Sequence, residues 1–235
     1  MAEIRRTAIF ALSCLLSLGG CWAASQDAES KRAPADVFAD TALDSEFWRG
    51  VPGVFATGDT HGVAVPGYKM EVRSRWTPDN LYFLFICPYE NLYLKPNPSR
   101  TTETFSLWDW DVAEVFIGSD FKDIRKYKEF EVSPQGEWID LDIDRGDPRN
   151  GLGGKWNSGF EVSARVDSNA RVWYAFMKIP YSSVDSRPAA AENILRVNFF
   201  LSVGPPGKHK LVAWRPTGQP TFHVPEAFGV LKLVD

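Results

Sequence analysis

The feature that most constrains the fold is a pair of adjacent segments with strand character. In residues 70–76, apolar or small side chains alternate with charged ones, as in a half-buried strand. Residues 77–80 read Thr-Pro-Asp-Asn, which favours a turn, and residues 81–87 are an apolar run. This combination predicts a β-hairpin. Cys87, at the end of the run, is then predicted to be a buried and unreactive thiol.

Similar short segments follow one another through the rest of the chain, without long helical patterns between them. The 18 glycines and 16 prolines are scattered between these segments, which favours many strands and turns. With 235 residues and 44% hydrophobic residues, the composition is typical of a single globular domain. We therefore predict an all-β protein, specifically an antiparallel two-sheet β-sandwich. The expected further strands are 112–117, 127–132, 138–144, 160–166, 172–179, 195–203, 210–214 and a last one near the end, with one short helix between 181 and 195.

The N-terminal residues 1–21 have the pattern of an export signal. Arg5 and Arg6 precede an apolar run over residues 7–18, which is too short to span a bilayer as a helix. The sequence Leu-Gly-Gly-Cys that ends at Cys21 resembles a bacterial lipobox, in which the cysteine becomes the lipidated first residue of the mature protein. A lipid on Cys21 would tether the protein to a membrane rather than span it.

The alternative is ordinary signal cleavage near Ala23 or Ala24, which would release a soluble exported protein. Residues 22–35 are small, polar and charged, so we predict a flexible linker there. The folded domain is then expected to cover residues 36–235.

A cluster of aromatic and acidic side chains precedes and enters the strand predicted at 112–117. Trp108 and Trp110 lie just before this strand, and Glu114 shares its face with apolar neighbours. A sugar ring needs an aromatic platform for its C–H faces and polar groups for its hydroxyls. This stretch therefore predicts a sugar-binding centre, although Trp110 fits the core as well as the site.

A second acidic region is expected in the hairpin formed by residues 127–132 and 138–144. Its glutamates and aspartates alternate with apolar residues, which predicts an acidic stripe on one face of the hairpin. Three interpretations remain open: a solvated outer face, the polar rim of a binding cleft, or oxygen ligands for calcium.

Catalysis is not favoured by the sequence. Asp111 and Glu114 are candidates for the two carboxylates of a glycoside hydrolase, but they are three residues apart at a strand entry, so their side chains are expected to diverge. His61, His209 and His223 have no metal-binding spacing, and motifs for hydrolases or phosphate loops are absent. The net charge of −4 gives no electrostatic basis for nucleic-acid binding.

Several features occur in the order found in the family 9 carbohydrate-binding modules and in family-9-like exported bacterial proteins with a DOMON-like sandwich. The resemblance covers residues 36–235, and it is their ordered combination that is specific. The features are Leu43-Asp44 with Phe47-Trp48, Trp76 with Asp79-Asn80-Leu81-Tyr82, Trp108 with Asp111 and Glu114-Val115-Phe116-Ile117, Val172-Trp173-Tyr174 before Lys178-Ile179-Pro180, then Asn198, Trp214, and Pro225 with Phe228-Gly229 and Leu231.

The resemblance implies a jelly-roll-like sandwich, structural calcium, and a slot in which two aromatic rings grip a terminal sugar. On that pattern Trp108 is one wall and Glu114 accepts hydrogen bonds from sugar hydroxyls. The second wall, a tryptophan in the family, falls on Phe222, and Gln219 lies near a polar sugar contact. The family's strand arginine falls on Glu131, which changes what the slot can hold.

From these features we expect a non-catalytic, exported and lipid-anchored protein of the bacterial periplasm, outer membrane or cell surface. It would hold the end of a sugar chain in support of polysaccharide degradation. An alternative is a haem-binding, electron-transfer module of DOMON type, for which Met70, Met177 and the histidines are the available ligands. A glycoside hydrolase is a third possibility.

Overall fold

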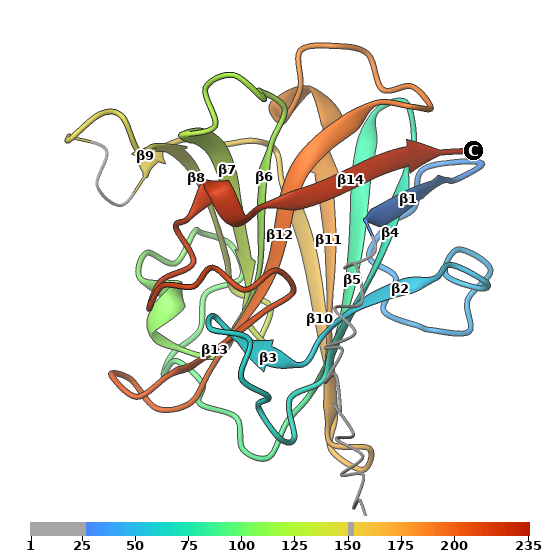
Figure 1. Ribbon diagram of the computed structural model, residues 1–235. Coiled ribbons are helices and arrows are strands. Elements are labelled where there is room, and N and C mark those ends of the chain that lie inside the picture. Colours follow the sequence, from blue (N-terminus) through green and yellow to red (C-terminus); the bar gives the residue numbers. More distant parts are fainter. Residues whose placement is uncertain (1–26, 150–152) are drawn as a thin grey trace, which may run out of the picture.

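The computed structural model (Figure 1) describes residues 27–149 and 153–235, and it confirms the all-β class. The helical elements of these residues are three single 3₁₀ turns, η1 (Leu107–Asp109), η2 (Tyr181–Ser183) and η3 (Pro225–Ala227). The strands are β1 (Ala28–Arg32), β2 (Gly53–Ala56), β3 (Gly58–Asp59), β4 (Met70–Trp76), β5 (Asn80–Pro88), β6 (Val112–Gly118), β7 (Lys126–Val132), β8 (Trp138–Asp144), β9 (Gly154–Lys155), β10 (Glu161–Asp167), β11 (Val172–Pro180), β12 (Ile194–Val203), β13 (Lys210–Ala213) and β14 (Gly229–Val234).

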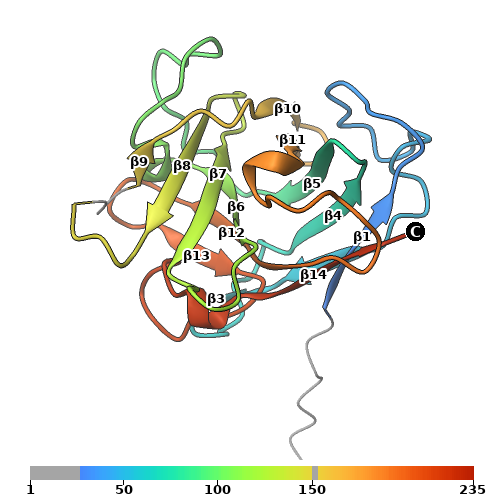
Figure 2. The same cartoon turned by 90° about the horizontal axis from the view of Figure 1, so that it is seen from above.

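These strands are hydrogen-bonded into one continuous sheet rather than two. Its main order is β10-β11-β5-β4-β1-β14-β12-β6-β7-β8-β9. The sheet curls on itself, so that the half containing β4, β5 and β11 faces the half containing β6, β7 and β12 (Figure 2). The prediction of two antiparallel sheets is therefore corrected in two respects. Strand β1 joins the halves through hydrogen bonds, and it is parallel to both of its neighbours, β14 and β4.

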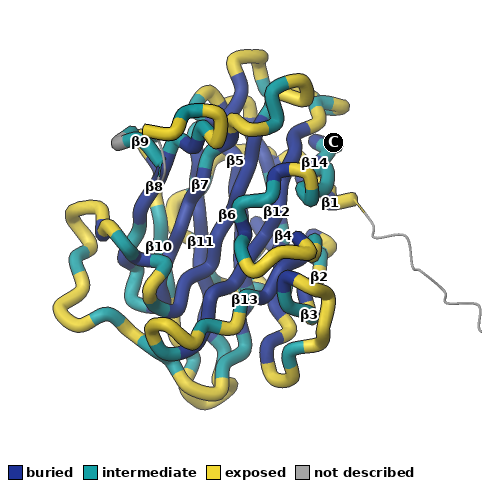
Figure 3. The backbone as a smooth tube through the Cα atoms, turned by 60° about the vertical axis from the view of Figure 1, so that its left-hand side comes forward, coloured by how far each residue is buried: buried dark blue, intermediate teal, exposed yellow. Residues whose placement is uncertain are grey.

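The main core lies between the two facing halves of the sheet, where the strands are almost entirely buried (Figure 3). The ring of Phe199 on β12 lies 5.5 Å from the ring of Phe83 and 6.0 Å from that of Phe85, both on β5. From β6, Ala113, Val115 and Ile117 point into the same core. The alternation predicted for this strand is confirmed.

The predicted hairpin is formed by β4 and β5, which are antiparallel and pair Trp76 with Leu81 at the turn. One face of β4 is buried because Met70, Val72 and Trp76, together with the small Ser74, occupy every second position. Cys87 is fully buried, as predicted, and this burial raises the pKa of its thiol well above the usual value.

The predicted linker is wrong for residues 28–32, because they form β1. Ala28 and Ser30 are buried whereas Glu29 is exposed, and the Ser30 hydroxyl lies 2.9 Å from the Ser74 hydroxyl that donates to it. The ordered domain therefore begins before residue 36. The predicted export signal and Cys21 lie outside the described residues, and no helix of the described residues is long and apolar enough to cross a membrane.

The predicted acidic stripe on the hairpin of β7 and β8 is also wrong. The register places Glu129 opposite Leu141 and Glu131 opposite Ile139, and directly paired residues share one face of a sheet. Asp140 is instead opposite Phe130, on the other face. The glutamates and the aspartates are thus separated by the sheet.

The solvated-face interpretation holds for neither glutamate, since Glu129 is 2% exposed and Glu131 is fully buried. Of the aspartates, Asp142 and Asp144 are partly exposed. The side chain of Asp142 is 2.6 Å from the Lys128 ammonium group, as expected of a surface ion pair.

Candidate ligand-binding pocket

A pocket of about 250 Å³ lies over the face of β6, β7 and β12 that points away from the main core. The sheet supplies Glu114, Phe116 and Glu129 to this pocket. Trp108, from η1, and Phe222, from the segment before η3, complete its lining from the loops. The pocket sits beside a second apolar cluster, which includes Phe116, Phe222 and the partly buried Trp108.

The two predicted aromatic walls differ in how much surface they offer. Trp108 is half-buried, and the ring of Phe105 contacts it edge-on at 5.2 Å between centroids. Phe222 is 7% exposed, because it stacks on Phe200 with 4.1 Å between ring centroids and 17° between ring planes. Trp108 is therefore the better platform for a ligand ring, and Phe222 is a wall held in place by the sheet.

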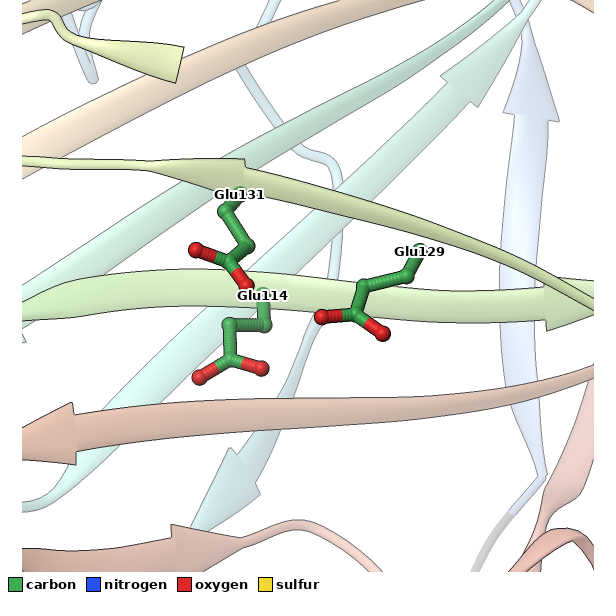
Figure 4. Close-up of side chains that lie close together, drawn as sticks. All are labelled: Glu114, Glu129 and Glu131. Atoms are coloured by element: carbon green, nitrogen blue, oxygen red, sulfur yellow. The ribbon is translucent and has the colours of Figure 1, made fainter. Parts of the chain in front are cut away.

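Three glutamates converge beside the pocket (Figure 4). Glu114 on β6 is paired directly with Glu131 on β7, and Glu129 lies two residues earlier on the same face of β7. One carboxylate oxygen from each lies within 4.8 Å of the others. Glu114 and Glu129 line the pocket, whereas Glu131 lies behind them. We call these three residues the glutamate cluster.

The glutamate cluster is poorly compensated by other protein groups. Glu114 Oε1, Glu129 Oε2 and both oxygens of Glu131 are buried without a hydrogen-bond partner. Burial raises the pKa of all three carboxyl groups, that of Glu129 to about 7, because removal from water disfavours the charged form. At neutral pH the isolated cluster would therefore retain protons.

His223 is the titratable neighbour of the cluster. Its Nε2 lies 3.9 Å from Glu129 Oε2, and its Nδ1 is hydrogen-bonded at 2.8 Å to the hydroxyl of Tyr127. Burial and the charge of Arg145 lower the pKa of His223 to about 4, so the ring is neutral at pH 7. The contact with Glu129 is consequently not an ion pair at that pH.

Asp111, a predicted site residue, lies outside the pocket. It is 1% exposed, its Oδ2 accepts a hydrogen bond from the Tyr93 backbone at 3.0 Å, and its Oδ1 accepts one from the Gly204 backbone at 2.9 Å. Burial raises the pKa of Asp111 to about 6, although these two hydrogen bonds oppose the shift. The geometry makes Asp111 a link between two loops, and it does not pair with Glu114 across the pocket.

Two further predicted residues do not line the pocket. Trp110 is half-buried and Gln219 is exposed at the surface. The structure thus brings together Trp108, Glu114 and Phe222, with Glu131 behind Glu114.

Asp109, which belongs to the segment predicted as the sugar-binding centre, also lines the pocket. Glu129 was expected only as part of the acidic stripe, and His209 and His223 were not predicted as sugar contacts. The alternation of residues 127–132 places Glu129 and Glu131 on one face, and this is the signal that could have identified Glu129. The two histidines come from loops that are distant in sequence, so no local pattern indicates that they meet.

Of the comparisons with known proteins, the one with solved structures bears on the fold. The sequence matches no family model, and no curated protein is significantly similar to it. A candidate carbohydrate-binding protein from Bacteroides uniformis superposes with a TM-score of 0.68 at 14% identity, covering 88% of this chain and all of the other.

Two structures of a family 9 carbohydrate-binding module from Caldicellulosiruptor kristjanssonii are also similar. The complex with cellotriose has a TM-score of 0.64 at 13% identity, over 89% of this chain and 94% of the other. The complex with glucose has a TM-score of 0.61 at 13% identity, over 87% and 95%. The resemblance to family 9 modules is therefore confirmed at the level of the fold, over nearly the whole length of these structures.

Proposed function

We propose that this protein is a non-catalytic carbohydrate-binding protein that holds a terminal sugar unit in the pocket of Trp108, Glu114 and Phe222. The observation that carries the proposal is the meeting of an accessible indole and buried, unpartnered carboxylate oxygens in one small cavity. The fold shared with structures that contain cellotriose and glucose supports it.

The chemistry of the pocket suits a sugar. The C–H face of a pyranose ring can pack on Trp108, and its hydroxyls can form hydrogen bonds with the carboxyl oxygens of Glu114. The cavity of about 250 Å³ is near the lower end of ligand pockets, roughly 300 Å³. This size favours a chain end over the interior of a polysaccharide.

Calorimetric titration with glucose, cellobiose and cellotriose, preceded by a glycan array, tests the proposal. Trp108→Ala should weaken binding about tenfold, about 1.4 kcal/mol, since it removes both the apolar area buried on the indole and the stacking contribution of about 0.5–1.5 kcal/mol. Trp110→Ala is the matched control, because this nearby tryptophan does not line the pocket. Absence of binding to every sugar, with no difference between wild type and Trp108→Ala, would overturn the proposal.

We further propose that the protein is exported and carries a lipid on Cys21, on the basis of the residue 1–21 pattern. Its place would be the periplasm, the outer membrane or the cell surface, in support of polysaccharide degradation. Detergent partition and mass spectrometry of the mature N-terminus test this. Cys21→Ser should move the protein into the soluble fraction, and a mature chain that begins near residue 24 in the wild type would contradict lipidation.

Within residues 27–149 and 153–235, the methionines and the second carboxylate that motivated the two alternative functions lie away from the pocket. Met70 and Met177, the methionines considered as haem ligands, are fully buried in the main core. Asp111, the second carboxylate of the hydrolase hypothesis, is held by the Tyr93 and Gly204 backbone amides.

A further inference from the structure

Negative charge on the glutamate cluster is not compensated by the protein groups that the structure describes around it. Glu114 and Glu129 are each 2% exposed and Glu131 is fully buried. Removing ionised carboxylates from water costs several kcal/mol per group unless a positive charge or hydrogen-bond donors compensate. Among the ion pairs of the described residues, the only one that involves the cluster is the 3.9 Å contact of Glu129 with His223, which places one imidazole beside three carboxyl groups.

We propose that Glu114, Glu129 and Glu131 form a binding site for an oxygen-preferring divalent cation, of the Ca²⁺ and Mn²⁺ class, at the floor of the pocket. The bound ion would present open coordination positions to the hydroxyl groups of a ligand in the pocket. This second part rests on the proposed sugar-binding function, whereas the cation site itself does not.

The geometry of the cluster fits one ion. Two oxygens bound to the same Ca²⁺ lie at most about 5 Å apart, because each Ca–O distance is about 2.3–2.6 Å. One oxygen from each glutamate lies within 4.8 Å of the others. A set of carboxylate oxygens alone favours Ca²⁺, Mn²⁺ or Mg²⁺ over ions that prefer sulfur ligands.

A second observation points to a ligand at this position. Glu131 is fully buried, yet neither of its oxygens has a hydrogen-bond donor from outside the glutamate cluster. Its side chain is directed toward Glu114 and Glu129 (Figure 4), so a group placed between the three carboxylates would satisfy it. A buried acceptor left unsatisfied costs about 1–3 kcal/mol, and more when it is charged.

His223 flanks the cluster in the orientation of a metal-site histidine. One ring nitrogen, Nδ1, is held by the Tyr127 hydroxyl, which leaves Nε2 at 3.9 Å from Glu129 Oε2. Second partners of this kind fix the orientation of ligating histidines. In the tautomer whose Nδ1–H donates to the Tyr127 hydroxyl, Nε2 carries the lone pair on the side of the cluster.

A divalent ion held between Glu114 and Glu131 would place a positive charge beside the pocket, with open positions that sugar oxygens can occupy.

Titration of the full-length chain, after removal of metals with a chelator, tests the cation site. Calorimetry with CaCl₂ and with MnCl₂ should show binding, and both salts should raise the melting temperature. Glu131→Gln should weaken the binding at least tenfold, and Glu114→Gln likewise. Glu137→Gln is the control, because Glu137 is an equally buried glutamate outside the cluster, and its metal binding should match the wild type.

Three outcomes would overturn the cation site. These are the absence of metal binding to the stripped wild type, equal binding by wild type and Glu131→Gln, and a gain in stability of Glu131→Gln with no effect of chelator on the wild type. The last result would mean that the carboxyl groups are satisfied by shared protons. If sugar binding persists in any of these cases, the proposed function stands while the inference fails.

The second part is tested by titrating the sugar with and without metal. Chelation should weaken sugar binding at least tenfold in the wild type, and restored Ca²⁺ or Mn²⁺ should recover it. Metal binding that leaves sugar affinity unchanged would overturn the role of the ion in ligand recognition. Failure of all sugars under both conditions, with metal binding intact, would refute the proposed function and leave the cation site standing.

Discussion

Glu129 is the member of the glutamate cluster that contacts a titratable side chain outside the cluster, that of His223. Its protonation makes the free energy of unfolding depend on pH. Burial raises its pKa to about 7 in the folded protein, against 4.5 for a solvated glutamate. The folded state therefore keeps a proton that the unfolded state releases. Between these two values the contribution of Glu129 to the free energy of unfolding falls as pH rises.

We expect metal-free Glu129→Gln to equal the wild type near about pH 4 and to exceed it in stability above about pH 7, by on the order of 3 kcal/mol. Urea unfolding across this range measures the difference. His223, whose pKa is lowered to about 4, makes stability rise with pH between about 4 and 6.5, so the variant and the wild type are compared at each pH. A difference independent of pH would show that Glu129 has a partner in the folded state.

Asp111 is expected to act on stability rather than on ligand binding. Both of its oxygens accept backbone N–H groups, from Tyr93 and Gly204. Asp111→Asn would direct an amide N–H₂ at one of these donors, which should lower the free energy of unfolding by about 1–3 kcal/mol. Sugar affinity of the folded variant should remain within about twofold of the wild type, a difference of roughly 0.4 kcal/mol.

Urea unfolding and calorimetry at low temperature separate these two effects. Asp109→Asn is the matched control, since Asp109 is exposed and lines the pocket; it should change stability little. A loss of sugar affinity in Asp111→Asn at unchanged stability would instead place Asp111 at the ligand.

At single positions, the sequence supported some site residues and missed others for a physical reason. Trp108 and Glu114 lie within one short segment, so their proximity is a local property of that segment. Phe222 was reached only through the family resemblance. Glu129 and His223 join the pocket through strand register and loop path, which depend on the whole sheet.

Among the elements, the short strand β1 connects the two halves of the sheet. It pairs in parallel with β14 from Ala28 to Lys31, and with β4 at Lys31 and Arg32. These pairs join the two halves of the sheet in one hydrogen-bonded order. Without β1, the edge of β14 and the Arg75–Trp76 end of β4 would be open, because β2 pairs only with residues 70–73 of β4.

A chain that begins at residue 36 should therefore be less stable than one that begins at Asp27, by at least ~3 kcal/mol for the loss of several backbone hydrogen bonds. It should also self-associate, because unpaired strand edges template pairing with other chains. Thermal unfolding and size-exclusion chromatography of the two chains provide the measurement. Equal melting temperatures and elution volumes would show that the sheet does not depend on β1.

Most elements other than β1 were predictable because their signals are local. The hairpin of β4 and β5 combines clear alternation, a turn sequence and an apolar run. Strand β1, with the sequence Ala-Glu-Ser-Lys-Arg, buries only small side chains, so it has the composition of a linker. The register of β7 against β8 was also not predictable, because a shift by one residue moves every side chain to the other face.

Across the whole molecule, the connection between distant parts of the chain sets the architecture. Ala28 pairs with Leu231, and this single contact region joins the first described strand to the last. The sequence indicated the all-β class through its many short strands, but contacts of such separation leave no local pattern. This is why two separate sheets were predicted, whereas one continuous sheet is found.

The continuous sheet predicts that ligand binding stabilises the entire domain. The pocket rests on β6, β7 and β12, and the same three strands form one half of the main core. Local opening of the pocket would therefore disturb the core, and unfolding should be cooperative. A sugar at about 100 times its dissociation constant should add about 2.7 kcal/mol to the free energy of unfolding.

Urea unfolding followed by far-ultraviolet circular dichroism and by tryptophan fluorescence measures this effect. Both transitions should coincide, and the sugar should shift both to higher urea by the same amount. In Trp108→Ala, which should bind the sugar weakly, the shift should be small at the same sugar concentration. If the sugar moved only the fluorescence transition, the loops that carry Trp108 and Phe222 would unfold as a separate unit, and the pocket would be an addition to the sheet rather than part of its cooperative structure.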